Sequence, residues 1–71
     1  MTSYAIVIEN AGINLAAYVP DLPGCVATGR NAAEVDRRIR IAIEMHLEGL
    51  VEEGLPIPEP SSRVEYIQVG A

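Results

Sequence analysis

Strand-forming residues dominate the first part of the chain. Residues 4–9 read Tyr-Ala-Ile-Val-Ile-Glu, and the β-branched and aromatic side chains in this run favour a strand. Asn10, Gly12 and Asn14 follow, and these residue types accept the positive φ angles that a tight reversal requires. We therefore expect a hairpin that leads into a second strand over residues 15–19.

Two prolines and a glycine interrupt the pattern after the second strand. Pro20 ends that strand, because proline has no N–H to donate to a ladder. Residues 21–24 read Asp-Leu-Pro-Gly, which predicts a turn that combines a proline-fixed φ with a permissive glycine. Residues 25–28 are short, alternating and followed by a glycine, so we expect a third strand there.

The longest periodic segment predicts a helix. It begins after Asn31, a good N-cap residue, with Glu34 three residues later as in a capping box. Gly54 and Pro56 supply the stop. At about 100° per residue, the apolar positions form one stripe that would pack on a sheet. The stripe consists of Val35, Ile39, Ala42, Ile43, His46, Leu47 and Leu50.

A proline-rich connector and a final alternating run complete the chain. Pro56, Pro58 and Pro60 favour an extended, polyproline-like segment that is unsuited to a central strand. Residues 64–69 read Val-Glu-Tyr-Ile-Gln-Val and predict a closing strand. The expected order is β-β-β-α-β in a single domain, an α+β fold in which one antiparallel sheet packs on one helix.

Length and charge narrow the possible classes of function. The 71 residues suffice for one domain at most. No apolar run approaches the ~20 residues needed to span a bilayer, and the N-terminus lacks a secretory pattern, so we expect a cytoplasmic protein without membrane contact. A net charge of −5, with no lysine, disfavours direct nucleic-acid binding. The same charge favours a cationic partner, although it also serves solubility alone.

A single helix leaves one face of the predicted sheet uncovered. Burial of that face, or of a sheet edge, by a second chain would stabilise so small a fold, so we expect a homo-oligomer (a dimer or a tetramer) or a protein partner. Ile41 and Met45 project opposite the core stripe and are candidate oligomer contacts. Ordinary surface is the alternative interpretation of this pair, because much of any protein surface is apolar.

The residue types that carry chemistry are sparse. His46 is the single histidine and lies within the apolar stripe, where a packed residue is the usual interpretation. Cys25 is the single cysteine, so it forms no intrachain disulfide, and we expect neither a metal site nor a cofactor. A Cys25–His46 hydrolase pair is conceivable on residue type alone, but no spacing brings the two together. We therefore expect a binding protein and not an enzyme.

Several linked motifs resemble the HicB antitoxin family. They are the run Tyr18-Val19-Pro20-Asp21-Leu22-Pro23-Gly24-Cys25, then Gly29, His46-Leu47-Glu48-Gly49-Leu50 and Gly54-Leu55-Pro56-Ile57-Pro58. The resemblance implies a partial RNase H-like fold with the same β-β-β-α-β order. It also implies a toxin–antitoxin role, in which the chain binds and masks HicA, a small basic ribonuclease that cuts messenger RNA.

One departure from that family concerns DNA. Many HicB antitoxins carry a C-terminal helix-turn-helix or ribbon-helix-helix domain that binds operator DNA. This chain ends at Ala71, directly after the predicted last strand. We therefore expect residues 1–71 to be a single HicB-like domain without a C-terminal DNA-binding domain, and we expect no direct nucleic-acid binding.

The predicted contact surface lies around the turn between the second and third strands. It comprises Tyr18, Pro20, Asp21, Leu22 and Pro23, together with exposed sheet positions. Asp21 would supply a charge contact, and the prolines would keep the turn rigid and lower the ordering cost of binding. The alternative is that this turn merely links two strands. At the level of function, the alternative to an antitoxin is an orphan, self-associating domain that acts as a scaffold or binds a small ligand.

Overall fold

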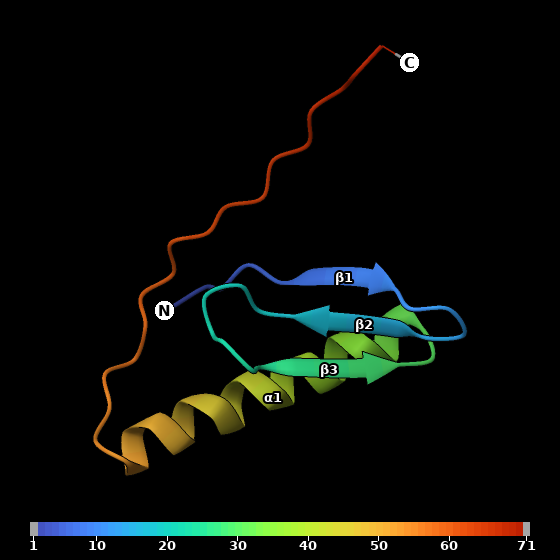
Figure 1. The fold of residues 1–71 in the computed structure, drawn as a ribbon. Coiled ribbons are helices and arrows are strands. Elements are labelled where there is room, and N and C mark those ends of the chain that lie inside the picture. The colour runs from blue at the N-terminus through green and yellow to red at the C-terminus, as the bar shows by residue number, and fades with distance from the viewer. Residues whose placement is uncertain (1, 71) are drawn as a thin grey trace.

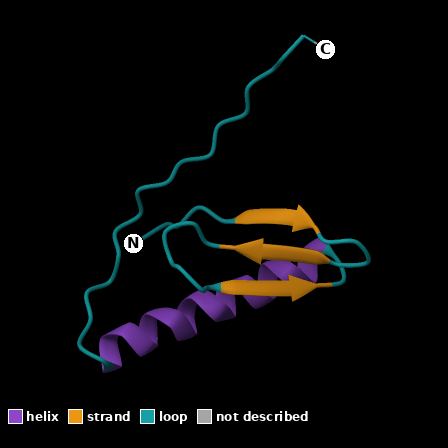
Figure 2. Ribbon diagram, in the orientation of Figure 1, coloured by secondary structure: helices purple, strands orange, loops and turns teal. Residues whose placement is uncertain are grey.

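Three short strands and one long helix make up the fold of the described residues (Figure 1). The computed structural model describes residues 2–70. The strands are β1 (Val7–Asn10), β2 (Leu15–Tyr18) and β3 (Val26–Gly29), and the helix is α1 (Ala32–Glu52). The strands form one antiparallel sheet in the order β1-β2-β3, and the helix packs on one face of it (Figure 2). The predicted α+β class is therefore confirmed.

The register of the sheet sorts its side chains onto two faces. Ile8 lies opposite Ala17, and Ala17 lies opposite Ala27. Since directly paired residues share a face, these three belong to the side that α1 covers, where Ala17 is buried. The neighbouring row consists of Val7, Tyr18 and Val26, and it belongs to the other side of the sheet.

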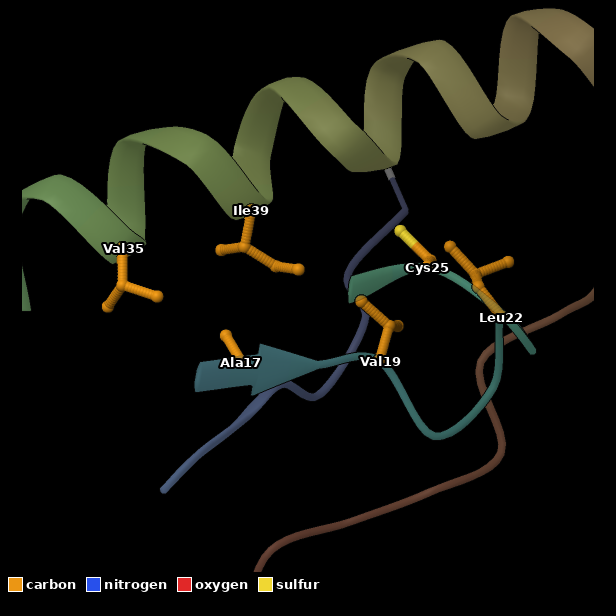
Figure 3. Packing of buried hydrophobic residues seen from close by; sticks show 6 residues of the cluster. All are labelled: Ala17, Val19, Leu22, Cys25, Val35 and Ile39. Carbon is orange, nitrogen blue, oxygen red and sulfur yellow. The ribbon is translucent and has the colours of Figure 1, made fainter. Parts of the chain in front are cut away.

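The core lies between the first half of α1 and the end of the sheet that leads into the β2–β3 loop (Figure 3). Val35 and Ile39 project from the helix toward Ala17, as Figure 3 shows. Val19, Leu22 and Cys25 extend this cluster into the loop, and all six side chains are buried. The loop is thus part of the core and not a loose connection.

The helix is much longer than the sheet that it covers. A strand of four residues spans about 13 Å, whereas the 21 residues of α1 span about 31 Å. Val35 and Ile39 of the predicted stripe are therefore fully buried, while Leu47 and Leu50 are only partly buried. Among the described elements, α1 packs on β2 and β3 and makes no contact with β1.

The start of the helix differs in detail from the predicted capping box. Asn31 is the N-cap, and its Oδ1 accepts a hydrogen bond from the Glu34 backbone N–H at 2.9 Å. The reciprocal bond runs from the Arg30 N–H to Glu34 Oε1 at 3.0 Å, one residue earlier than a capping box requires. Arg30 and Arg38 also form ion pairs with this nearly buried carboxylate, each at 3.4 Å. The helix start is therefore held by hydrogen bonds and charge together.

The end of the helix is a Schellman motif at the predicted glycine. Gly54 has a φ of 70°, which disfavours any residue with a Cβ. Its N–H donates to the Val51 carbonyl at 3.1 Å, and the Leu55 N–H donates to the Leu50 carbonyl at 2.9 Å. The chain reverses here and runs back past the sheet (Figure 1).

Residues 64–69 form no strand within this chain, which corrects the predicted order of elements. They are extended and exposed, and no backbone hydrogen bond joins them to another part of residues 2–70. Figure 1 shows the segment leaving the body of the molecule past β1. The physical reason is that alternation reports a preference for extended backbone, whereas a strand also needs a neighbour to pair with.

Candidate partner-binding surface

Two consecutive turns build the β2–β3 loop. The Leu22 N–H donates to the Val19 carbonyl at 3.0 Å, with Pro20 in the second position of that turn. The Val19 N–H in turn donates to the Cys25 carbonyl at 3.2 Å, which closes the base of the loop. Proline at the second position fixes φ at the value that such a turn requires.

The second turn follows at once. The Cys25 N–H donates to the Leu22 carbonyl at 3.1 Å, with Pro23 and Gly24 in the two central positions. Gly24 has a φ of 83°, as the third position of a type II turn demands. The loop therefore has two proline-set turns and needs little further ordering when something binds to it.

Leu22 does not contribute a side chain to the surface. It lies between the two turns and is 0 % exposed, which makes it one of the largest fully buried side chains of the core. The sequence pattern places Leu22 among the partner contacts, and its burial is incompatible with that role. Its neighbours Pro20 and Pro23 are exposed. Leu22 thus anchors the loop, and the two prolines are what the loop presents to solvent.

Asp21 binds the chain's own C-terminal segment. Its Oδ2 accepts hydrogen bonds from the backbone N–H groups of Ser61 and Ser62, each at 3.0 Å. Its Oδ1 accepts from the two serine hydroxyls, at 3.0 Å for Ser61 and 2.8 Å for Ser62. These bonds, with the Ser62 N–H first, lower the pKa of Asp21 to about 2.

This contact joins residues 40 positions apart, so local sequence patterns give no sign of it. A second contact lies nearby, where the Tyr4 hydroxyl donates to the Pro58 carbonyl. Asp21 and Tyr4 together fix where the proline-rich connector passes the sheet. We call these two contacts the latch. The latch determines where the segment after Ser62 leaves the body of the protein.

The uncovered face of the sheet carries an apolar row beside the loop. The row consists of Val7, Tyr18 and Val26, one residue from each strand. Tyr18 is 40 % exposed and Val26 is more exposed still. Because Tyr18 ends β2 and Val26 begins β3, the row lies next to the loop that carries Pro20 and Pro23. Of the predicted contact residues, Tyr18 and the two prolines are therefore exposed together at one end of the sheet.

The outer face of the helix carries the predicted oligomer contacts. Ile41 and Met45 lie one turn apart and are both exposed. Further along, Leu47, Glu48, Val51 and Glu52 line an open hollow of about 350 Å³ near the end of α1. This hollow lies where the helix extends beyond the sheet, and Ile41 and Met45 do not belong to it.

Cys25 and His46, the two residues considered for catalysis, lie in positions that disfavour it. Cys25 is buried in the core, and desolvation raises the pKa of its thiol, which disfavours the nucleophilic thiolate. His46 is half-buried on α1, and no hydrogen bond joins it to Cys25 within residues 2–70. In the same residues, no three His, Cys, Asp or Glu side chains gather closely enough to hold a metal ion.

The described part of the chain also contains no helix with the length and apolar character needed to cross a membrane.

Comparison with known protein families assigns the chain to one of them. The family described as "HicB-like antitoxin of bacterial toxin-antitoxin system" matches residues 4–70. The chain therefore belongs to the HicB-like antitoxin family.

A relative from Haemophilus phage HP1 (strain HP1c1) is 33% identical over 64 residues, which cover 90% of this chain. That relative is named only as an uncharacterized 14.9 kDa protein in the rep-hol intergenic region. The match covers 48% of its length, so the chain spans about half of the relative. No solved structure matches the chain.

Proposed function

We propose that this chain is a non-catalytic antitoxin that binds and masks a basic, HicA-type mRNA interferase in the cytoplasm. Membership of the HicB-like antitoxin family supports the antitoxin role. The observation that carries the contact surface is the apolar row of Val7, Tyr18 and Val26 beside a rigid loop, in which Tyr18 and Val26 are exposed and Val7 is half-buried.

The row and the loop offer what a tight protein contact needs. Tyrosine is enriched among the residues that contribute most to binding, because it combines a large apolar ring with a polar hydroxyl. Pro20 and Pro23 are exposed on turns whose hydrogen bonds are already formed, so little conformational entropy is lost on docking. We place Tyr18 at the centre of the contact, with the two prolines at its rim.

Charge supports a basic partner. The chain carries ten carboxylates against five cationic side chains, for a net charge of −5. A ribonuclease needs cationic groups to hold the phosphates of its substrate, so the fields of the two proteins are complementary. Covering the RNA-binding surface of the toxin is enough to stop cleavage, and no chemistry by the antitoxin is then required. In this role the chain does not bind DNA by itself.

The experiment compares two exposed apolar residues on opposite sides of the molecule. Tyr18→Ala and the control Met45→Ala are each purified and titrated calorimetrically into the basic toxin. We expect Tyr18→Ala to weaken binding by at least about tenfold, which corresponds to ~1.4 kcal/mol. Met45→Ala should bind as the unmodified chain does. Equal affinity for Tyr18→Ala would overturn the proposed surface, and no binding of the toxin by the unmodified chain would overturn the function.

The alternative function is an orphan domain that self-associates as a scaffold or binds a small ligand. The exposed pair Ile41 and Met45 and the open hollow near the end of α1 favour this candidate. Native mass spectrometry of the chain purified from its own host separates the two. A heterologous basic protein in the complex supports the antitoxin, whereas a homo-oligomer or a bound small molecule without such a protein supports the alternative.

A further inference from the structure

The segment after the latch is rich in strand-forming residues but pairs with no other strand of residues 2–70. Its Val64, Tyr66, Ile67 and Val69 side chains are all exposed, with Tyr66 at 94 % and Ile67 at 81 %. We call residues 63–70 the tail. β-branched and aromatic residues in this density favour sheet pairing, and leaving them in water forgoes the free energy of burial.

β1 offers a matching open edge. It pairs with β2 on one side, and no other strand of residues 2–70 lies along its second side. An edge strand presents backbone N–H and C=O groups that can pair with a further strand. Ile8 sits on this edge on the helix side of the sheet, yet it is exposed because α1 does not extend over β1. The edge thus has both unpaired backbone and uncovered apolar surface.

The tail is held away from the edge of its own chain. Asp21 fixes Ser61 and Ser62, and the prolines of the connector limit bending just before that point. From there the tail runs outward (Figure 1). The radius of gyration is 13.9 Å, compared with the ~11 Å expected for a compact chain of this length. The tail is therefore presented to a neighbour while its own sheet edge stays open.

We propose that residues 64–69 of one copy pair with β1 of a second copy, and that the second copy returns the same contact. Each sheet then gains a fourth strand, and a two-fold dimer leaves neither the tail nor the β1 edge unpaired. The occupant of the edge is a copy of this chain, because the chain itself supplies both the unpaired strand and the unpaired edge.

The charge of the tail agrees with this pairing. Two copies of a chain with a net charge of −5 repel one another at long range. Residues 63–70 contain one cationic and one anionic side chain, Arg63 and Glu65, which form an ion pair at 3.0 Å. The pairing segment 64–69 has a single carboxylate, Glu65, and the ion pair with Arg63 just before it reduces the repulsion between the two copies. The exchange extends the sheet beyond β1 and leaves the row of Val7, Tyr18 and Val26 open, so this inference does not depend on the toxin.

The first test uses the full chain with two prolines in the tail. Tyr66→Pro/Ile67→Pro removes two adjacent N–H groups, one of which faces the neighbouring strand in any register. Both side chains are exposed in the single copy, so its fold is unaffected. Gly70→Pro, just outside the pairing segment, is the control. Mass by light scattering should be twice 7.6 kDa for the unmodified chain and the control. The double variant should be a folded monomer of 7.6 kDa by circular dichroism and light scattering.

The second test asks whether the contact is between chains. In a Cys25→Ala background, one full-length chain carries Ile8→Cys and a differently tagged chain carries Ile67→Cys. The two are mixed and treated with a flexible bismaleimide, which tolerates an uncertain register. We expect a covalent heterodimer, and a Met45→Cys chain in place of the Ile8→Cys chain should give little.

Three results would overturn the exchange. They are a monomeric unmodified chain, a proline variant that keeps the dimer mass, and a Met45→Cys control that cross-links as well as Ile8→Cys.

Discussion

The β2–β3 loop and the tail both lie outside the strands and the helix and both carry apolar residues, but they differ in burial. In the loop, Val19, Leu22 and Cys25 belong to the buried core cluster, two backbone hydrogen bonds close the two turns, and a third closes the base of the loop. In the tail, the apolar side chains are exposed and the backbone has no partner within residues 2–70. The loop packs within its own chain, whereas the tail is exposed and available to pair with a second copy. The difference shows that apolar side chains hold a segment against the body of the protein only where that body offers a surface that buries them.

The largest expected change in stability is at Leu22, and Ile67 in the tail provides the comparison. Leu22→Ala removes buried atoms from the core and should lower the free energy of unfolding by about 2–5 kcal/mol. Ile67→Ala removes exposed atoms from the tail, so a single copy should change by less than about 0.5 kcal/mol. Urea melts at several protein concentrations measure both.

The concentration dependence sharpens this contrast. The loss at Leu22 should be the same at every concentration, while any loss at Ile67 should grow with concentration because it reflects association. A large loss for Ile67→Ala in dilute solution would contradict the description of the tail. Leu50→Ala should lower the free energy of unfolding by an amount between those of Leu22→Ala and Ile67→Ala, because Leu50 is only partly buried near the end of α1.

The next largest change in stability is expected at Gly29, with Gly70 as the comparison. A Cβ at Gly29 would lie 2.6 Å from the Val35 backbone nitrogen, which is too close without a shift of β3 against α1. Gly29→Ala should therefore destabilise the protein by about 1–3 kcal/mol. Gly70→Ala meets no atom within 4 Å and is the control. Thermal or urea unfolding measures both variants, and equal stability would show that β3 and α1 approach less closely than described.

The helix cap should contribute less. Asn31→Ala removes the oxygen that accepts the Glu34 N–H and should cost about 1 kcal/mol in a urea melt. Asn31→Asp keeps an acceptor at the same position and should lose little. If Asn31→Ala unfolds at the same urea concentration as the unmodified chain, the hydrogen bonds and ion pairs of Glu34 alone define the helix start.

The smallest effect is local and concerns the latch. The pKa of Asp21 is lowered from 3.8 to about 2 in the folded chain, so its bonds to Ser61 and Ser62 favour the latched state above pH 3.8. That contribution is lost as the pH falls through about 2, where the carboxylate takes up a proton. The Ser62 amide resonance followed by NMR should report this transition, and Asp21→Asn should abolish it. A Ser62 amide that titrates near 3.8 would contradict the latch.

Local patterns were sufficient to predict most of the fold. Asn31 predicted the helix start and Gly54 predicted its end, and the structure confirms both. The turn predicted at residues 21–24 lies one residue later, at 22–25, and it follows a turn at 19–22 that was not predicted. In the first hairpin Gly12 has a positive φ, whereas Asn10 and Asn14 do not. Each of these features depends on residues a few positions apart. The three strands were predicted for the same reason, although each is shorter or slightly displaced in the structure.

The features that the sequence did not reveal are long-range. Asp21 was expected to contact a partner, but its hydrogen bonds reach Ser61 and Ser62, which no local pattern relates to it. Leu22 was expected to contact a partner, yet its side chain is fully buried in the core cluster. The closing strand was predicted from alternation alone, which says nothing of its pairing partner. Tyr18, Pro20 and Pro23 were placed at an exposed site correctly, while their role in binding stays a prediction.

The most direct measurement is RNA cleavage by the purified basic toxin as this chain is added. We predict that cleavage stops when the antitoxin reaches one copy per toxin, and that Tyr18→Ala requires a clear excess to do the same. The chain without toxin should leave RNA intact. Undiminished cleavage in a large excess of the chain, or cleavage by the chain on its own, would contradict the account.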